Sequence, residues 1–157
     1  MAVLGKPVTG YDEIFIAAPV RTVFEYVTRP DLWHEWHPAS TSAEIPRVPL
    51  RAGDRFREII TVRYPLVKIR RHTEYEVSLS ELHHTWEVRG ESSLFLLTIH
   101  YDFRAEKGGT LFQRTLTYRV KGTLSYFEPI LVRPKIRRQS KQALGNLKRK
   151  LESGKLT

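Results

Sequence analysis

Apolar and polar residues alternate through most of the chain between Gly53 and Lys121. A period of two is typical of β-strands that bury one face and expose the other. Turn residues at Tyr64-Pro65 and at Gly108-Gly109 divide this region into strands with short connections, which favours an antiparallel meander. The predicted strands cover residues 54–63, 66–79, 84–90, 93–104 and 111–121.

The chain before the meander predicts a strand, two helices and another strand. The first strand covers residues 11–18 and ends before Pro19, which suits the first turn of a helix because proline lacks an N–H. That helix has an apolar stripe formed by Val20, Val23, Phe24 and Val27. Pro30 ends it, a short helix over residues 31–36 follows, and residues 40–45 form a short strand.

The last long segment, residues 125–151, has apolar residues at helical spacing. They are Ile136, Ala143, Leu144, Leu147 and Leu151. A sheet with one apolar face needs a cover to keep that face from water. We therefore expect the last helix to lie across the sheet.

Two features indicate that this helix is not uniform. Ser125 and Glu128 have the spacing of a capping box, which predicts a helix that begins at Tyr126. Pro134 removes a helical hydrogen bond and disfavours helix in the residue before it, which predicts a break at residues 132–134. The residues before the break would form a separately adjustable flap at one end, where a ligand would enter. They are Tyr126, Phe127, Ile130 and Leu131.

Together these elements predict an α+β fold in which a curved antiparallel sheet of about seven strands wraps around the long last helix, in the order β-αα-β6-α. We expect one domain over residues 1–157, with residues 1–10 as a tail. Because successive strand residues point to opposite faces, the meander has two sets of alternate positions, here called the inward and the outward parity. The inward parity is aromatic and aliphatic, whereas the outward parity is polar and charged.

Three charged residues fall on the inward parity: Glu58, Arg71 and Arg114. A buried charge without a partner costs several kcal/mol, so each needs a partner, a place at a rim, or a ligand. In one interpretation Glu58 and Arg71 pair across the first hairpin, and Arg114 reaches solvent. In another, an arginine inside a cavity lined by tyrosine and tryptophan orients an acidic or carbonyl-bearing ligand. A bulge that shifts the parity is the third.

The amino-acid composition and motifs exclude several kinds of functional site. The chain has no cysteine, which excludes disulfides, thiolate metal sites and thiol nucleophiles. No segment has the length and apolarity of a signal peptide or a membrane span, so we expect a cytoplasmic protein. His34 and His37 share a predicted helix face but lack a third ligand, and the glycines fit no phosphate-binding loop. We therefore expect no metal and no cofactor.

A net charge of +9 raises the expectation of an anionic partner. Cations gather in the last helix, at Arg133, Lys135, Arg137, Arg138, Lys141, Lys148, Arg149 and Lys150. This run is either the solvated face of the helix, a surface for anionic membranes, or a nucleic-acid surface. No recognition motif accompanies the charge, so nucleic acid is the least favoured partner. The oligomeric state is left open.

Several short stretches share a pattern: a strand that ends in Ala18-Pro19, a helix that carries Val23-Phe24, a break at Pro30-Asp31, and Trp33 followed by Trp36. In these residues the chain resembles the polyketide cyclase/dehydrase and lipid-transport group of the START-like (SRPBCC) superfamily. Residues 53–56 and 147–152 resemble the start of that family's third strand and the end of its last helix. The resemblance implies a helix-grip fold, and functions that range from carriers of apolar ligands to cyclases and aromatases. It implies no catalytic residue.

Our leading hypothesis is non-covalent binding or transport of an apolar or amphipathic molecule, such as a lipid, a polyketide or an isoprenoid, between the sheet and the last helix. An alternative is a cyclase, aromatase or dehydratase that uses general acid–base chemistry, with Tyr75, Tyr101, Tyr118, Glu58 and Arg114 as the available groups. A third is a binder of anionic membranes or nucleic acids through the basic helix. The candidate cavity residues are Glu58, Arg71, Tyr75, Trp86, Tyr101, Arg114, Tyr118, Phe127, Ile130 and Leu131.

Overall fold

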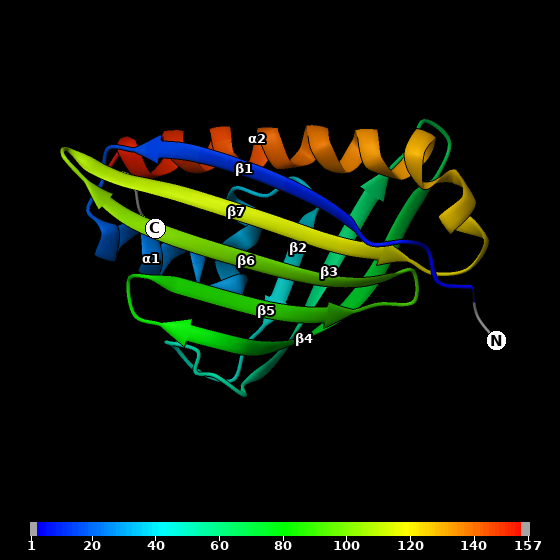
Figure 1. The fold of residues 1–157 in the computed structure, drawn as a ribbon, viewed down its shortest axis with the longest axis horizontal. Helices are drawn as coiled ribbons and strands as arrows, with labels where there is room; N and C mark the ends of the chain where they lie inside the picture. The colour runs from blue at the N-terminus through cyan, green and yellow to red at the C-terminus, as the bar shows by residue number, and fades with distance from the viewer. Residues whose placement is uncertain (1–2, 155–157) are drawn as a thin grey trace.

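The computed structural model describes residues 3–154 of the chain. Seven antiparallel strands form one sheet in the order β1-β7-β6-β5-β4-β3-β2 (Figure 1). The strands are β1 (Val8–Ile16), β2 (Ser40–Glu44), β3 (Arg55–Arg63), β4 (Lys68–Glu81), β5 (Thr85–Glu91), β6 (Phe95–Glu106) and β7 (Gly109–Val120). The helices are α1 (Val20–Val27), the 3₁₀-helices η1 (Pro30–Glu35) and η2 (Gly122–Phe127), the π-helix η3 (Glu128–Val132) and α2 (Arg133–Glu152). The α+β class and the element order are confirmed.

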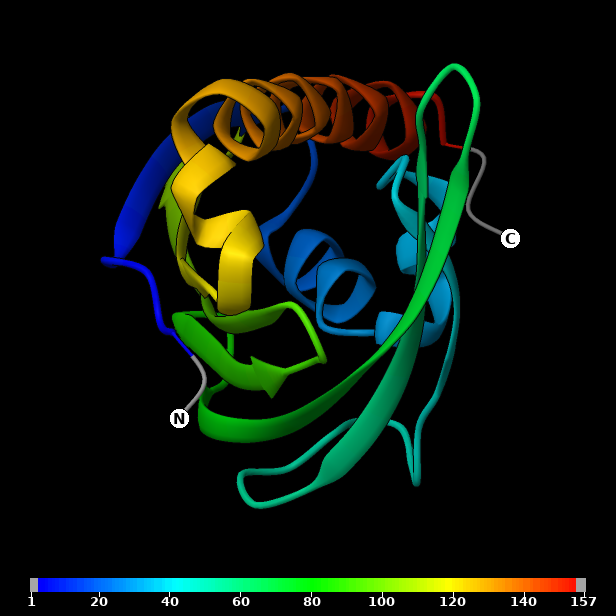
Figure 2. The ribbon, with the colours of Figure 1, turned by 90° about the vertical axis from the view of Figure 1, so that its right-hand side faces the viewer.

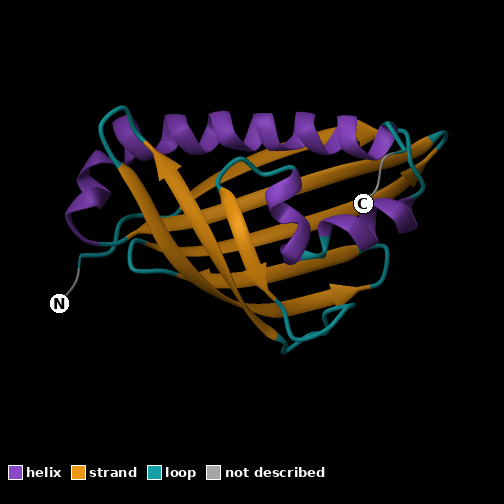
Figure 3. Ribbon diagram, turned by 180° about the vertical axis from the view of Figure 1, so that it is seen from behind, coloured by secondary structure: helices purple, strands orange, loops and turns teal. Residues whose placement is uncertain are grey.

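The sheet curls into an incomplete tube, and helices close two of its openings. The strands bend from β1 round to β2, with α2 across the gap between these edges (Figure 2). The pairing shifts between Val77 and Leu79 in β4, and β-bulges of this kind increase local bending. Helices α1 and η1 cover one end of the tube (Figure 3). The apolar inner parity therefore faces an enclosed space.

Aromatic residues fill the end of the tube near α1 and η1. The indole of Trp33, on η1, makes edge contacts with the rings of Phe56, Tyr75 and Trp86 at centroid distances of 5.7, 5.8 and 6.2 Å. The Trp33 Nε1–H donates to the Val27 carbonyl at 2.8 Å, which ties η1 to the end of α1. This end is a packed core.

The predicted tail is wrong in its extent. Strand β1 begins at Val8, and before it Leu4 forms an isolated bridge with Lys121. The Gly5 N–H donates to the Val120 carbonyl at 2.8 Å. Pairing with β7 holds this stretch although its sequence does not alternate clearly. Residues 1 and 2 lie outside the described residues.

The last helical segment changes type close to where Pro134 predicts a break. The π-helix η3 ends at Val132 and α2 begins at Arg133, and the axis turns there (Figure 2). The predicted capping box is wrong, because the Ser125 hydroxyl donates to the Gly122 carbonyl at 2.7 Å within the 3₁₀-helix. The α-helix consequently starts at Arg133 rather than at Tyr126.

Candidate functional site

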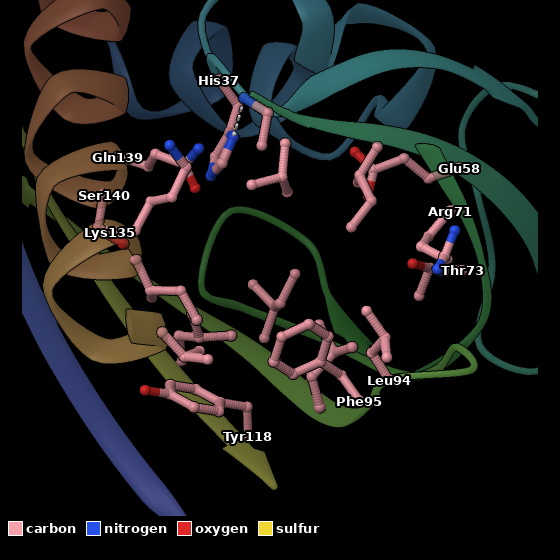
Figure 4. A pocket seen from close by; sticks show the side chains of 18 of the residues that line it. His37, Glu58, Arg71, Thr73, Leu94, Phe95, Tyr118, Lys135, Gln139 and Ser140 are labelled. Atoms are coloured by element: carbon pink, nitrogen blue, oxygen red, sulfur yellow. Dashed lines mark hydrogen bonds between the residues drawn. The ribbon is translucent and has the colours of Figure 1, made fainter. Parts of the chain in front are cut away.

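A cavity of about 450 Å³ lies between the sheet and α2 (Figure 4). Its walls are mainly aliphatic and aromatic side chains from β3, β4, β6 and β7, closed above by residues of η3 and α2. The apolar wall includes Ile60, Val62, Ile69, Leu97, Ile99, Leu116, Leu131, Val132 and Ile136. The strand residues among them have the inward parity, and Ile136 belongs to the apolar stripe of α2, so the alternating pattern builds most of the cavity wall. Leu131 and Val132 come from η3.

The cavity has a closed end and an open end. Of the residues that line it, Tyr64, Val67 and Leu131 are exposed to solvent by 36, 54 and 49%. They belong to the β3–β4 connection and to η3, so the mouth lies between these two segments. At the other end, Tyr75 and Tyr101 are 5 and 1% exposed.

A cluster of polar side chains lies at the closed end. The Tyr75 hydroxyl donates to Glu58 Oε1 at 3.1 Å, and Arg114 Nη1 donates to the Ser140 hydroxyl at 3.1 Å. Glu58 and Arg114 are only 5 and 4% exposed. The Arg114 Nε–H has no hydrogen-bond partner among the described residues, and Arg114 lines the cavity. The cluster therefore offers a cationic donor to whatever oxygen enters the cavity.

Burial shifts the pKa values of the titratable side chains in and beside this cluster. Desolvation raises the pKa of Glu58 from 4.5 to about 7, and the Tyr75 hydroxyl and the Arg114 charge oppose the rise. Desolvation also raises the pKa of Tyr101 to about 12, although the neighbouring Arg114 favours the phenolate. For His37, which also lines the cavity, burial and the Arg114 charge lower the pKa from 6.5 to about 3. At neutral pH the histidine is uncharged and Glu58 is close to half-ionised.

Tyr75 reaches Glu58 because β5 has a glycine beneath its ring. Gly90 is the partner of Tyr75 in the β4–β5 register, and a Cβ at Gly90 would lie 2.5 Å from the Tyr75 ring. The ring stacks on Phe56 at a centroid distance of 4.9 Å and an interplanar angle of 16°. Packing on both sides fixes the hydroxyl toward the cavity.

The predicted ion pair between Glu58 and Arg71 is not formed. The β3–β4 register places Glu58 opposite Thr73, and Arg71 opposite Ile60. Arg71 instead donates from Nη1 to the Arg70 carbonyl at 2.9 Å, although it still lines the cavity. The expectation that Arg114 reaches solvent is also wrong, and the interpretation with an arginine inside the cavity describes the geometry.

Seven of the candidate residues line the cavity: Glu58, Arg71, Tyr75, Tyr101, Arg114, Tyr118 and Leu131. Three do not. Trp86 is fully buried behind the wall, where it stacks on Tyr101 at a centroid distance of 5.5 Å. Phe127 and Ile130 are 48 and 70% exposed and do not line the cavity.

Sequence reasoning missed several polar lining residues, namely His37, Thr73, Lys135, Gln139 and Ser140. Ser140 carried a usable signal, because it follows Ile136 by four residues and so lies on the apolar stripe of α2. Thr73 had the inward parity but an ordinary strand residue gives no sign of lining a cavity. Within residues 3–154, no cluster of three or more His, Cys, Asp or Glu is arranged to hold a metal ion.

The sequence model of one protein family, described as polyketide cyclase / dehydrase and lipid transport, matches residues 8–152. The chain belongs to this family. The match confirms the resemblance drawn from the strand, helix and tryptophan pattern near the N-terminus. Family and fold together are of the type that binds hydrophobic ligands. No curated protein sequence matches the chain at a significant level.

Solved structures share the fold at low sequence identity. Ara h 8.0201 is 15% identical, with a TM-score of 0.69 over 94% of this chain and 99% of that one. TTHA0849 from Thermus thermophilus is 18% identical, with a TM-score of 0.72 over 95 and 100% of the two chains. The di-domain ARO/CYC BexL from the BE-7585A biosynthetic pathway is 20% identical, with a TM-score of 0.66 over 93% of this chain and 50% of that one. These likenesses show the fold alone.

Proposed function

We propose that this protein binds an apolar or amphipathic small molecule, of lipid, polyketide or isoprenoid type, in the cavity beneath α2. The observation that carries the proposal is a cavity of about 450 Å³ with apolar walls and a buried polar cluster at its closed end. Small-molecule sites commonly have volumes of about 300–1,000 Å³ and combine apolar walls with a few polar groups. Membership of a lipid-transport and polyketide-cyclase family supports the same conclusion.

The two parts of the cavity would contribute differently to binding. Apolar surface removed from water contributes about 25 cal/mol per Å², which gives affinity with little selectivity. The closed-end cluster would set the orientation, since the Arg114 Nε–H lacks a partner among the described residues and the Glu58 carboxyl can accept or donate near neutral pH. We therefore expect the ligand to carry a carbonyl, carboxyl or hydroxyl oxygen at one end, directed toward Arg114.

Binding can be tested with a matched pair of variants on β6. Leu97 lines the cavity, whereas its neighbour Leu96 does not. We expect Leu97→Trp to fill the cavity and to lower the affinity for an apolar fluorescent probe such as 1-anilinonaphthalene-8-sulfonate by at least about tenfold. Leu96→Trp should bind as the wild type does. Equal binding by both variants, together with no co-purified lipid in native mass spectrometry, would contradict the proposal.

Enzymatic activity is a second candidate function, which we propose on one specific observation. Glu58, with a pKa of about 7, accepts a hydrogen bond from the Tyr75 hydroxyl inside the cavity. A carboxyl with a pKa near the working pH suits general acid–base catalysis on a bound carbonyl compound. Turnover of a poly-β-ketone that is lost in Glu58→Gln or Arg114→Met, with probe binding retained, would support it. Unchanged turnover in both variants would exclude these roles.

A further inference from the structure

The positive charge of the protein is concentrated in two short segments. Residues 63–72 and 122–142 contain nine Lys and Arg and one Glu, a net charge of +8, whereas the whole chain carries +9. The single acid, Glu128, is buried and bonded to Arg133 and Tyr118. The cations are Arg63, Lys68, Arg70, Arg71, Arg133, Lys135, Arg137, Arg138 and Lys141. All other residues together therefore carry a net charge of only +1.

Both segments border the mouth of the cavity. The first is the β3–β4 hairpin tip, and the second runs from η2 through η3 into the first turns of α2 (Figures 1 and 2). They touch directly, because the Lys135 ammonium donates to the Arg63 carbonyl at 2.8 Å and lies 4.8 Å from the centre of the Tyr64 ring. The charge thus forms one basic surface around the mouth.

Exposed apolar side chains lie within the same basic surface. Among the described residues, thirteen large hydrophobic side chains are exposed, and seven of them belong to these two segments. Leu66 is 100% exposed, Ile130 is 70% and Tyr126 is 69%. The others are Tyr64, Val67, Phe127 and Leu131. An exposed apolar patch surrounded by polar groups indicates an interaction site.

We propose that the mouth docks on an anionic lipid bilayer. Its cations would lie among the phosphates of the headgroups, while Leu66, Ile130 and their apolar neighbours insert to the level of the acyl chains. Charge complementarity favours an anionic surface, and the apolar tips distinguish a bilayer from nucleic acid, whose phosphates offer aliphatic side chains nothing to insert into. Docking in this orientation would open the cavity toward the lipid without a path through water.

Vesicle flotation tests the docking directly. We expect the full-length protein to float with vesicles of phosphatidylcholine and phosphatidylglycerol, and at least about tenfold less with phosphatidylcholine alone. Each cation replaced by glutamine, at Lys68 or Arg70, should lower the partition coefficient by about fivefold. Raising the salt concentration from about 0.05 to about 0.5 M should also release the protein, because the screening length becomes much shorter.

The contribution of the apolar side chains to vesicle binding is tested with separate variants. The double variant Leu66→Ser with Ile130→Ser should lower the partition coefficient by about tenfold or more. Both sites are exposed, so the fold should persist. The matched control is Leu82→Ser, because Leu82 is 65% exposed on the β4–β5 turn, beside His83, which packs on Phe24 at the closed end. That control should float as the wild type does.

Three results would overturn the proposal. The first is that the protein does not float with anionic vesicles. The second is that Leu82→Ser lowers the partition coefficient as much as the Leu66→Ser/Ile130→Ser variant does. The third is that the Leu66→Ser/Ile130→Ser variant binds vesicles as the wild type does. The last result, combined with salt-sensitive binding to duplex DNA, would assign the basic surface to nucleic acid. Docking is independent of ligand binding in this design, since Leu97→Trp fills the cavity but leaves the mouth unchanged. Vesicle binding by Leu97→Trp would therefore stand even if the small-molecule proposal failed.

Discussion

The two ends of the tube are built from the same strands yet have opposite properties. At the closed end, Trp33 and Trp86 are 3 and 0% exposed and lie within one aromatic cluster. At the mouth, Leu66 and Ile130 are 100 and 70% exposed. Helices α1 and η1 cover the first end, whereas η2 and η3 border the second without closing it. Stability is therefore concentrated at one end and access at the other.

Two glutamates show the same contrast in their ionisation. At the closed end, burial raises the pKa of Glu58, and the hydrogen bond from the Tyr75 hydroxyl offsets only part of the rise. Near the mouth, hydrogen bonds from Arg133 lower the pKa of Glu128, which also accepts from the Tyr118 hydroxyl at 2.7 Å. At neutral pH the Glu58 carboxyl is thus about half-ionised, whereas the Glu128 carboxyl is ionised. The difference follows from the partners, because an arginine stabilises the Glu128 anion, whereas Glu58 accepts its hydrogen bond from an uncharged tyrosine hydroxyl.

The largest expected effect tests whether the closed end holds the fold. Trp33→Ala removes three aromatic contacts and the hydrogen bond to Val27, and should lower the free energy of unfolding by about 3–5 kcal/mol. Tyr126→Ala at the mouth, where the side chain is 69% exposed, should change it by less than about 0.5 kcal/mol. Urea denaturation followed by circular dichroism measures both. Similar losses in the two variants would contradict the contrast.

The second prediction concerns pH. The pKa of Glu58 is about 7 in the folded protein and near 4.5 in the unfolded chain, so between these values the folded state binds more protons. Stability should therefore fall as the pH rises from 4.5 to 7, by about 3 kcal/mol for this group. Glu58→Gln should lack this loss.

The measurement is the difference in unfolding free energy between wild type and Glu58→Gln across that pH range. His37 acts in the opposite direction, because its pKa is lowered from 6.5 to about 3 and its contribution is lost as the pH falls. It is present in both proteins, so it cancels in the difference. A difference that does not vary with pH would show that Glu58 keeps its ordinary pKa.

A third prediction concerns the strand beneath Tyr75. Gly90→Ala places a methyl group against the Tyr75 ring and should lower the free energy of unfolding by about 1–3 kcal/mol. Gly10→Ala is the matched control, because Gly10 is also in a strand and a Cβ there meets no atom within 4 Å. Thermal denaturation should separate the two variants clearly. If Gly90→Ala were as stable as Gly10→Ala, Tyr75 would not be held by close packing.

The alternation of side chains allowed the strands and the inward face to be predicted, because period two is a local property of the sequence. The partner of Glu58 was not predictable in the same way. Its position depends on the length of the β3–β4 connection, residues 64–67, and a tighter turn would change the residue opposite Glu58 from Thr73. Register is fixed by the loop and by packing rather than by either strand alone.

Parity also says which face a residue occupies, but not its depth along the tube. Trp86 and Tyr101 are both inward and pair directly across β5 and β6. Only Tyr101 lines the cavity, because Trp86 is covered by neighbouring rings. The reverse difference occurs at the flap, where Phe127 and Ile130 are apolar but exposed, and neither lines the cavity. An apolar residue in a sequence does not reveal whether it meets the core, a ligand or another surface.

The last prediction concerns Lys135 at the mouth, where the expected effect on stability is small. Its ammonium joins α2 to the β3–β4 hairpin through the Arg63 carbonyl and the Tyr64 ring. Lys135→Met removes both contacts and should lower the free energy of unfolding by no more than about 1 kcal/mol. The dissociation of a cavity-bound fluorescent probe should nevertheless become several-fold faster, since the hairpin is released from α2. Lys141→Met, on the exposed side of α2, is the control for lost charge. Stopped-flow displacement measures both rates, and equal rates would show that the Lys135 contacts do not restrict passage through the mouth.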